Sequence, residues 1–598
     1  MSEHFAHAMP WGASAQGPGN TRFHLWAPAA VAAHVELQDG RRMPMQQDGT
    51  GHWSAGVACG PGTAYRYGLR LAGGRELSVA DPASRAQQGD VDDASLVLDP
   101  QAYAWQHAWT GRPWHETVVY ELHVGTLGGF AGVTAQLASL AALGITAIEL
   151  MPVNDFPGPR NWGYDGVLPF APDAAYGTPD ELKRLIDTAH GFGLMVFLDV
   201  VYNHFGPDGN YLGVYAPGFF RDGASTAWGG AIDFRRPEVR SFFTSNALYW
   251  LMEYRFDGLR IDAAHAIAEQ DWLADMARAV RSAAEPGRHV HLVLEHDGNA
   301  SGLLQQGFDA QWNDDGHHVL HVLLTGEQDG YYRDYAHAPA NRLARCLAEG
   351  FIYQGESSLH RGGLPRGEPS ATLPPTAFVL FLQNHDQTGN RAFGERLSIL
   401  AHPAALRAAQ ALLLLAPQIP LLFMGEESAS TTPFLYFTSH RTPELAEAVH
   451  RGRWQEFAGS AAFADEASRA RIANPNDEAT FTRSVPASVG EHGDPATAWV
   501  RELLALRQRY IVPHLPDCRS LGAETLGPAA VLARWQLGPR VLTLAVNLAT
   551  EPAGNLRGQD AAAAATSADT LFDSGGAHVA WAAGTLPGHA FLALLEPA

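Results

Sequence analysis

Three carboxylic acids each follow a short apolar run: Asp262 in "GLRIDAAH", Glu295 in "LVLEHD" and Asp386 in "FLQNHDQ". Two carboxyl groups at close range can cleave a glycosidic bond, because one attacks the anomeric carbon while the other protonates the leaving oxygen. Their surroundings must therefore push the two pKa values apart. Arg260 lies two residues before Asp262 on the same strand face, and a guanidinium favours the ionised carboxylate. We predict Asp262 as the nucleophile. Glu295 follows the apolar "HLVL", so we predict a raised pKa and the role of proton donor.

These side chains can meet only if their strands share one sheet. Apolar runs alternate with amphipathic helical segments such as 132–144 and 178–193, between about residues 106 and 515. The expected strands are 118–124, 147–153, 195–201, 258–264, 291–297, 308–314, 378–386 and 419–427. Several of them end in charged or imidazole residues, and barrel enzymes build their active sites at the carboxyl ends of strands. The pattern predicts an α/β fold with a (β/α)8 TIM barrel; a doubly wound sheet is the alternative.

A β-rich segment flanks the predicted barrel on each side. Residues 1–105 contain short alternating runs separated by Gly, Pro and Asp, which predict an N-terminal β-sandwich. Residues 516–598 return to alternating runs and predict a small C-terminal β-sandwich domain. Within it, the low-complexity segment 558–569 is expected to be a surface loop.

The composition excludes several classes of function. The chain has 41 Lys plus Arg against 63 Asp plus Glu, a net charge of −22 without a basic tract, so nucleic acids and anionic membranes are not expected partners. The sole lysine, Lys183, follows no Gly-rich loop, which argues against a P-loop and a Schiff base. Gln and Pro interrupt the apolar stretch 408–425, which we interpret as a helix end, a turn and a buried strand. Three widely spaced cysteines and a start that does not resemble a secretory signal predict a cytoplasmic protein.

Four segments in order resemble the motifs of the α-amylase family, glycoside hydrolase family 13. They are "DVVYNH" (199–204), "GLRIDAAH" (258–265), "LVLEHD" (292–297) and "FLQNHDQ" (381–387). The resemblance implies a retaining mechanism in which Asp386 is a third carboxylate that binds sugar hydroxyls. It also implies a subsite for the cleaved sugar, formed by Tyr164, His204, Arg260 and His385. The other residues that we expect to bind substrate are Trp162, Asp199, His265, Trp312, Asp315 and His317.

Finer features resemble those members of the family that release trehalose from trehalose-capped maltooligosaccharides. They include "ELMPVNDFPGPRNWGYDG" (149–166) and "QWNDDGHHVLHVLLTGE" (311–327). The resemblance implies this substrate, an N-terminal sandwich similar to a carbohydrate-binding module, and a second enzyme that forms the capped chains. Branching enzymes typically have Ser-His-Asp-Glu where this chain has residues 384–387 as Asn-His-Asp-Gln. An α-amylase-like hydrolase, a branching enzyme or a non-catalytic glucan-binding protein remain alternatives, and the oligomeric state stays open.

Some residues permit a second interpretation. His317 and His321 would share a helix face, but the zincin pattern needs a glutamate where His318 stands, so we expect sugar contacts or helix capping by Asp314 and Asp315 instead. Asn203 matches a calcium-binding position of some amylases, but no full set of oxygen ligands accompanies it, and we predict neither metal nor cofactor. As aromatic platforms, Trp162 and Trp312 are expected in the cleft, whereas Trp26 is expected in the core.

Overall fold

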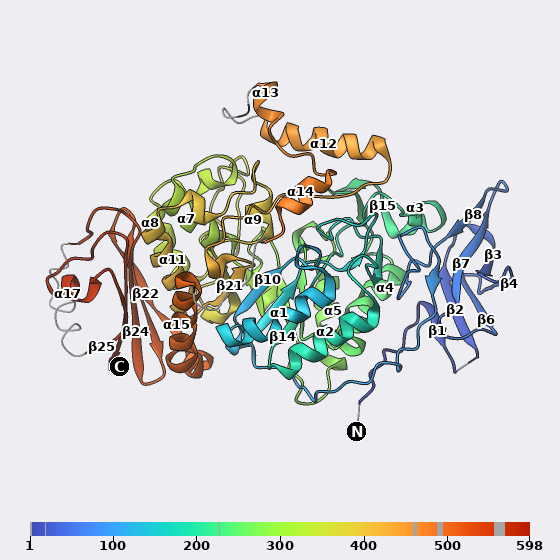
Figure 1. Ribbon diagram of the computed structural model, residues 1–598, viewed down its shortest axis with the longest axis horizontal. Coiled ribbons are helices and arrows are strands. Elements are labelled where there is room, and N and C mark those ends of the chain that lie inside the picture. Colours follow the sequence, from blue (N-terminus) through green and yellow to red (C-terminus); the bar gives the residue numbers. More distant parts are fainter. Residues whose placement is uncertain are drawn as a thin grey trace.

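The computed structural model describes residues 3–17, 19–226, 228–458, 463, 465–486, 494–554 and 568–597 of the 598-residue chain. Its centre is a closed barrel of parallel strands, each paired with the next along the chain (Figure 1). The strands are β10 (Val119–Leu122), β11 (Ala147–Leu150), β14 (Met195–Val200), β17 (Gly258–Ile261), β18 (His291–Leu294), β19 (Ala310–Trp312), β20 (Phe378–Phe381) and β21 (Ile419–Phe423). The predicted barrel is confirmed, and every expected strand contains one of these.

Helices cover the outside of the barrel, so its strands are buried on both faces and consist mostly of apolar residues. The principal ones are α1 (Gly129–Leu143), α2 (Pro179–Gly191), α4 (Pro237–Leu248), α5 (Gln270–Ala283), α7 (Asp314–Thr325), α8 (Pro339–Glu349) and α11 (Pro403–Leu415). α2 begins with a capping box between Thr178 and Glu181, and Pro179 occupies its first turn. The stretch 408–425 forms the end of α11, a turn and β21, as interpreted from the sequence.

Strand register decides which side chains meet at the barrel rim. Asp199 of β14 pairs with Arg260 of β17, and Arg260 pairs with Val293 of β18. Because all strands run in the same direction, Asp262, Glu295 and Asp386 emerge at the same end of the barrel, just beyond β17, β18 and β20.

The N-terminal segment forms two facing antiparallel sheets at one end of the molecule (Figure 1). One contains β1 (Gly12–Ala15), β2 (Thr21–Trp26), β6 (His52–Val57) and β5 (Gln46–Gln47). The other contains β4 (Arg42–Pro44), β3 (Ala30–Leu37), β7 (Ala64–Leu71), β8 (Glu76–Val79) and the short β9 (Ser95–Leu96). Trp26 is buried, as predicted, and its ring lies 5.4 Å from that of Phe219, so it packs where this domain meets the barrel domain.

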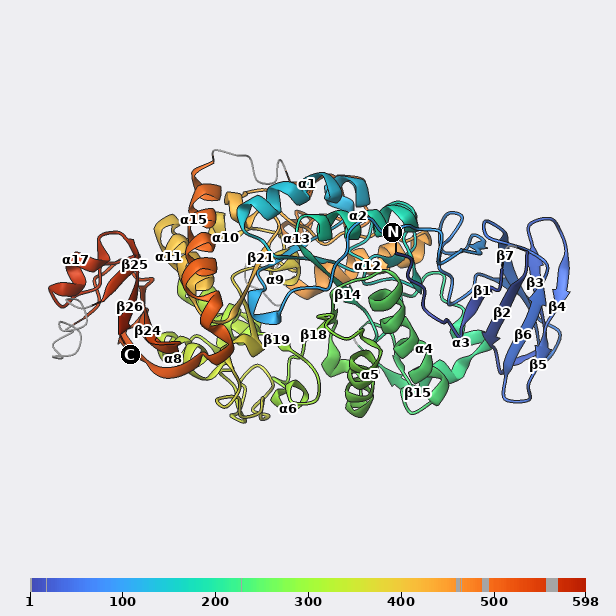
Figure 2. The ribbon, with the colours of Figure 1, turned by 90° about the horizontal axis from the view of Figure 1, so that it is seen from below.

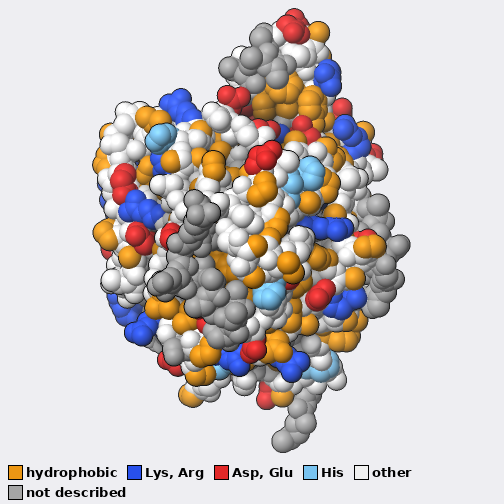
Figure 3. Space-filling view, turned by 90° about the vertical axis from the view of Figure 1, so that its left-hand side faces the viewer, with side chains coloured by type: hydrophobic (Ala, Val, Ile, Leu, Met, Phe, Trp, Pro, Cys, Tyr) orange, Lys and Arg blue, Asp and Glu red, His pale blue; other side chains and the backbone are white. Residues whose placement is uncertain are grey.

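The C-terminal sheet lies at the opposite end (Figure 2). Its order is β22 (Arg519–Gly527), β23 (Ala530–Leu537), β24 (Arg540–Asn547), β26 (Ala590–Pro597) and β25 (Asp569–Ser574). Between the last barrel strand and this sheet, the chain forms the helices α12 (Pro443–Phe457) and α15 (Pro495–Tyr510). Acidic and basic side chains are interspersed over this end of the molecule (Figure 3). The segment 558–569, expected to be a surface loop, lies almost wholly outside the described residues.

No helix among the described residues is long and apolar enough to cross a bilayer.

Candidate active site

A single buried guanidinium connects the predicted nucleophile and proton donor. Arg260 Nη1 lies 2.6 Å from Asp199 Oδ2 and 3.0 Å from Asp262 Oδ1, and Nη2 lies 3.0 Å from Glu295 Oε2. The guanidinium is fully buried and lies 4.3 Å from the centroid of the Trp312 ring. Asp262 and Glu295 therefore share one cation, and the face of that cation lies on an aromatic ring.

The backbone and a neighbouring amide orient these two carboxylates. Asn203 Nδ2 donates to Asp262 Oδ2 over 2.7 Å, which aims the second oxygen of that carboxylate. Ala263 has a φ of 38°, a conformation rare for a residue with a Cβ, and its N–H donates to Glu295 Oε2 over 2.7 Å. Glu295 thus contacts a cation and an N–H donor, and the apolar surroundings expected from "HLVL" are not found.

The third carboxylate, Asp386, forms an ion pair with His385, and His385 also contacts Tyr164. His385 Nε2 lies 2.8 Å from the Tyr164 hydroxyl and 3.5 Å from Asp386 Oδ1. The Tyr164 hydroxyl donates to Asp199 Oδ2 over 2.6 Å, and its ring stacks on the imidazole at 5.1 Å. Burial would lower the pKa of His385, but the carboxylates of Glu121 and Asp386 outweigh it and raise the pKa to about 9.

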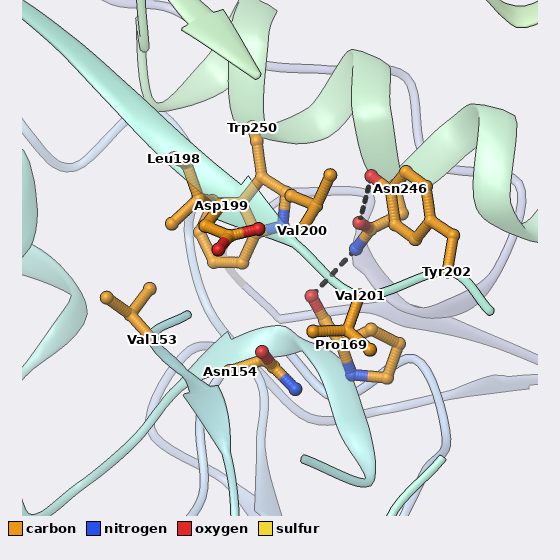
Figure 4. A pocket seen from close by; sticks show the side chains of 10 residues that line it. All are labelled: Val153, Asn154, Pro169, Leu198, Asp199, Val200, Val201, Tyr202, Asn246 and Trp250. Carbon is orange, nitrogen blue, oxygen red and sulfur yellow. Dashed lines mark hydrogen bonds between the residues drawn. The ribbon is translucent and has the colours of Figure 1, made fainter. Parts of the chain in front are cut away.

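Three more of the predicted residues are His204, His265 and Asp199. His204 Nε2 lies 2.9 Å from the carbonyl of Tyr164, so it fixes the loop that carries the tyrosine. His265 is exposed, with its ring 5.9 Å from that of His296, beside the segment that follows Glu295. Asp199 lies at the end of β14 near Trp250, where Tyr202 donates to Asn246 and Asn246 donates to the carbonyl of Pro169 (Figure 4).

The two predicted tryptophan platforms are buried instead. Trp312 is 1% exposed and packs inside the barrel under Arg260. Trp162 is 3% exposed, stacks on Phe434 at 5.2 Å and donates its Nε1 hydrogen to the carbonyl of Leu435. Neither ring has a free face for a sugar, and both support the site from behind.

Asp315 and His317 are likewise part of the scaffold. Asp315 has no exposed surface; its oxygens accept hydrogen bonds from Asn299, Tyr335 and the backbone of Ile352 and Tyr353, and it pairs with Arg366 at 3.0 Å. His317 lies between the carbonyl of Leu382 and the Tyr332 hydroxyl. The expected capping by Asp314 and Asp315 is wrong, because Asn313 is the N-cap of α7 and accepts from the Gly316 N–H.

Two residues important to the geometry were absent from the predicted site. Glu121 on β10 contacts His385, and Asn203 holds Asp262. The sequence contained a signal for Glu121, since a carboxylate within the apolar run "VVYELHV" needs a partner when buried. Asn203 Nδ2 donates to Asp262, and Asn203 Oδ1 contacts the His204 ring. The described residues contain no group of three or more His, Cys, Asp and Glu side chains arranged for a metal ion.

The chain is similar to several known proteins. Family models match residues 10–84 (Carbohydrate-binding module 48, isoamylase N-terminal domain), 88–213 (Alpha amylase, catalytic domain) and 518–592 (a domain of unknown function, DUF3459). Malto-oligosyltrehalose trehalohydrolases from Rhizobium sp. (strain M-11) and Deinococcus radiodurans are 40% and 39% identical, over 87% and 83% of this chain and 89% and 82% of theirs. A solved structure from Salmonella typhimurium, provisionally named an alpha amylase, is 42% identical with a TM-score of 0.88, covering 99% of this chain and 100% of its own.

Proposed function

Because the chain belongs to the malto-oligosyltrehalose trehalohydrolases, we infer that it cleaves the α-1,4 bond next to a terminal trehalose unit and releases trehalose and a maltooligosaccharide. It is a retaining glycoside hydrolase of the α-amylase type.

We assign the chemical steps as follows. The Asp262 carboxylate attacks the anomeric carbon while Glu295 gives its proton to the leaving oxygen of trehalose, and a covalent glycosyl ester forms. Glu295 then takes a proton from water, the water oxygen bonds to the anomeric carbon, and the ester bond to Asp262 breaks. Asp386 binds sugar hydroxyls, and Tyr164 forms the base of the same subsite.

The observation that carries this assignment is the shared contact of Asp262 and Glu295 with Arg260, at 3.0 Å each. In retaining enzymes the two carboxyl groups lie about 5 Å apart, with no room for a water molecule between nucleophile and sugar. A common guanidinium keeps both carboxyl groups beside one cation.

Product analysis with two substrates tests the function. We expect efficient release of trehalose from maltopentaosyl-trehalose and much slower cleavage of maltoheptaose. Equal cleavage of both would favour an α-amylase-like hydrolase, and longer branched products would favour a branching enzyme.

Two further properties are proposed. A 1,1-linkage at the chain end must be made before it can be removed, so an enzyme that forms such caps would supply the substrate. Cys59, Cys346 and Cys518 are buried and unpaired, which fits a reducing compartment such as the cytoplasm.

A further inference from the structure

Glu121 is a buried carboxylate in the first barrel strand and touches no predicted catalytic acid. It is 1% exposed. One of its oxygens accepts the backbone N–H of His385 over 3.0 Å, and the other contacts His385 Nδ1. β10 and β20 are separated in the barrel only by β21, so this contact joins the strand that opens the barrel to the residues that follow its seventh strand.

The hydrogen bonds determine the protonation of the imidazole. The hydroxyl of Tyr164 has one hydrogen, and it donates that hydrogen to Asp199. It must therefore accept from His385 Nε2, which requires a hydrogen on Nε2. On the other side of the ring, a carboxylate can only accept, so Nδ1 also needs a hydrogen. With hydrogens on both nitrogens, the ring is an imidazolium.

We propose that Glu121 is a positioning residue for the hydrolysis, which fixes the His385 ring and keeps it cationic, so that Nε2 donates to Tyr164 and the ring pairs with Asp386 as a cation. A neutral imidazole with its hydrogen on Nδ1 would turn Nε2 into an acceptor. Tyr164 would then have two acceptors, Asp199 and His385, for its single hydrogen, and one of the contacts at the base of the subsite would be lost.

Other titratable groups also face this ring. The acids facing it besides Glu121 are Glu149 on β11, Asp199 on β14 and Asp386 beside it. Arg260 opposes its protonation, whereas burial lowers the pKa of His123 to about 4, and Tyr164 stacks on the ring. Of these acids, only Glu121 and Asp386 approach the ring nitrogens, and Asp386 does so at 3.5 Å. Among these acids, Glu121 is therefore the one whose removal should change the protonation of the His385 ring most.

The test compares pH profiles of kcat/KM for the full chain and for Glu121→Gln, Glu121→Asp and the matched control Glu427→Gln. Glu427 is also buried and bound to the first strand, through the Tyr120 hydroxyl at 3.0 Å, but is not in contact with His385.

We expect the alkaline limb of the wild type near pH 9. In Glu121→Gln it should move by at least about one pH unit toward the ordinary histidine value of about 6.5, with at least about a tenfold loss of kcat/KM at pH 8. Glu121→Asp should recover part of the shift, and the control should match the wild type. Coincident limbs in the wild type and Glu121→Gln would overturn the proposal.

A second measurement needs neither substrate nor variant activity. In ¹⁵N-histidine-labelled protein, with the His385 signal assigned by its loss in His385→Asn, both ring nitrogens should have imidazolium shifts at pH 7.5. A neutral ring in the wild type at this pH would overturn the inference even if Glu121→Gln does not fold. The inference rests on the proposed function for its kinetic arm alone: failure to release trehalose would reject the function and leave the titration of His385 unaffected.

Discussion

At the scale of single residues, Arg260 explains why an arginine and a carboxylate occupy one face of a buried strand. One guanidinium contacts Asp199, Asp262 and Glu295, and its face lies on Trp312. A planar group with five donors can satisfy three acids at once, whereas an ammonium is a single point charge. The nucleophile and the proton donor therefore depend on the same cation.

Replacement of this cation should affect both stability and activity. We expect Arg260→Met to lower the free energy of unfolding by about 3–5 kcal/mol, because buried carboxylates lose their partner. Denaturant unfolding at pH 7 measures this change. Arg278→Met is the control, since Arg278 is 71% exposed and its pair with Asp275 should matter little. An equal effect in both variants would contradict the central role of Arg260.

The two catalytic acids can be told apart by the leaving group. Glu295→Gln should lower kcat on the trehalose-capped substrate by about 10²–10⁴-fold, because proton transfer to the leaving oxygen is lost. A maltosyl fluoride needs no such proton, so Glu295→Gln should form the glycosyl ester from it almost as fast as the wild type. Asp262→Asn should fail on both substrates, since it lacks the nucleophile. Rates of fluoride release check this, and reversed behaviour would exchange the two roles.

At the scale of elements, the barrel could be predicted because its strands are short apolar runs with polar ends, and because parallel strands place those ends at one rim. Asp262, Glu295 and His385 were placed correctly relative to the strands for this reason. The direction of a side chain at the rim depends on closure and packing, which a sequence pattern does not contain. In the structure Trp312 packs inside the barrel, and Asp315 is buried and pairs with Arg366.

At the start of α7, the N-cap is Asn313 and not the neighbouring Asp314. Asn313 accepts from the Gly316 N–H and donates to the carbonyl of Gly350, so it fixes the helix end to the chain after α8. We expect Asn313→Ala to lower the free energy of unfolding by at least about 1 kcal/mol, from the lost cap and the unpaired carbonyl.

Asp314 provides the matched control for that variant. Burial and the nearby Glu295 raise the pKa of Asp314 well above its ordinary value, so its charged form is disfavoured. Asp314→Asn should therefore keep or increase stability in the same denaturant titration. A larger loss for Asp314→Asn than for Asn313→Ala would restore the capping role expected for Asp314.

At the scale of the whole molecule, the N-terminal sandwich docks on the barrel domain through aromatic rings. Trp11 packs against Phe242 at 5.6 Å and Trp26 against Phe219 at 5.4 Å. Two histidines of the sandwich lie beside this contact: His24 stacks on His52 at 5.0 Å, and the Trp11 ring lies 5.4 Å from His24. A charge placed here would be costly, because it would be desolvated and would face a second imidazole.

This arrangement predicts that the sandwich contributes to a loss of stability in acid. Burial, and then His52 and Arg22, lower the pKa of His24 to about 4, against a weaker opposing effect of the Pro10 carbonyl and Asp48. Because the unfolded chain binds a proton near pH 6.5 and the folded chain only near pH 4, stability falls as the pH decreases through this window.

His24→Phe keeps an aromatic ring that cannot be protonated, so its unfolding free energy should fall less than that of the wild type between pH 6.5 and pH 4. Denaturant unfolding at several pH values measures the difference, and His337→Phe, at an exposed position, should follow the wild type. Parallel curves for the wild type and His24→Phe would show that acid acts elsewhere in the molecule.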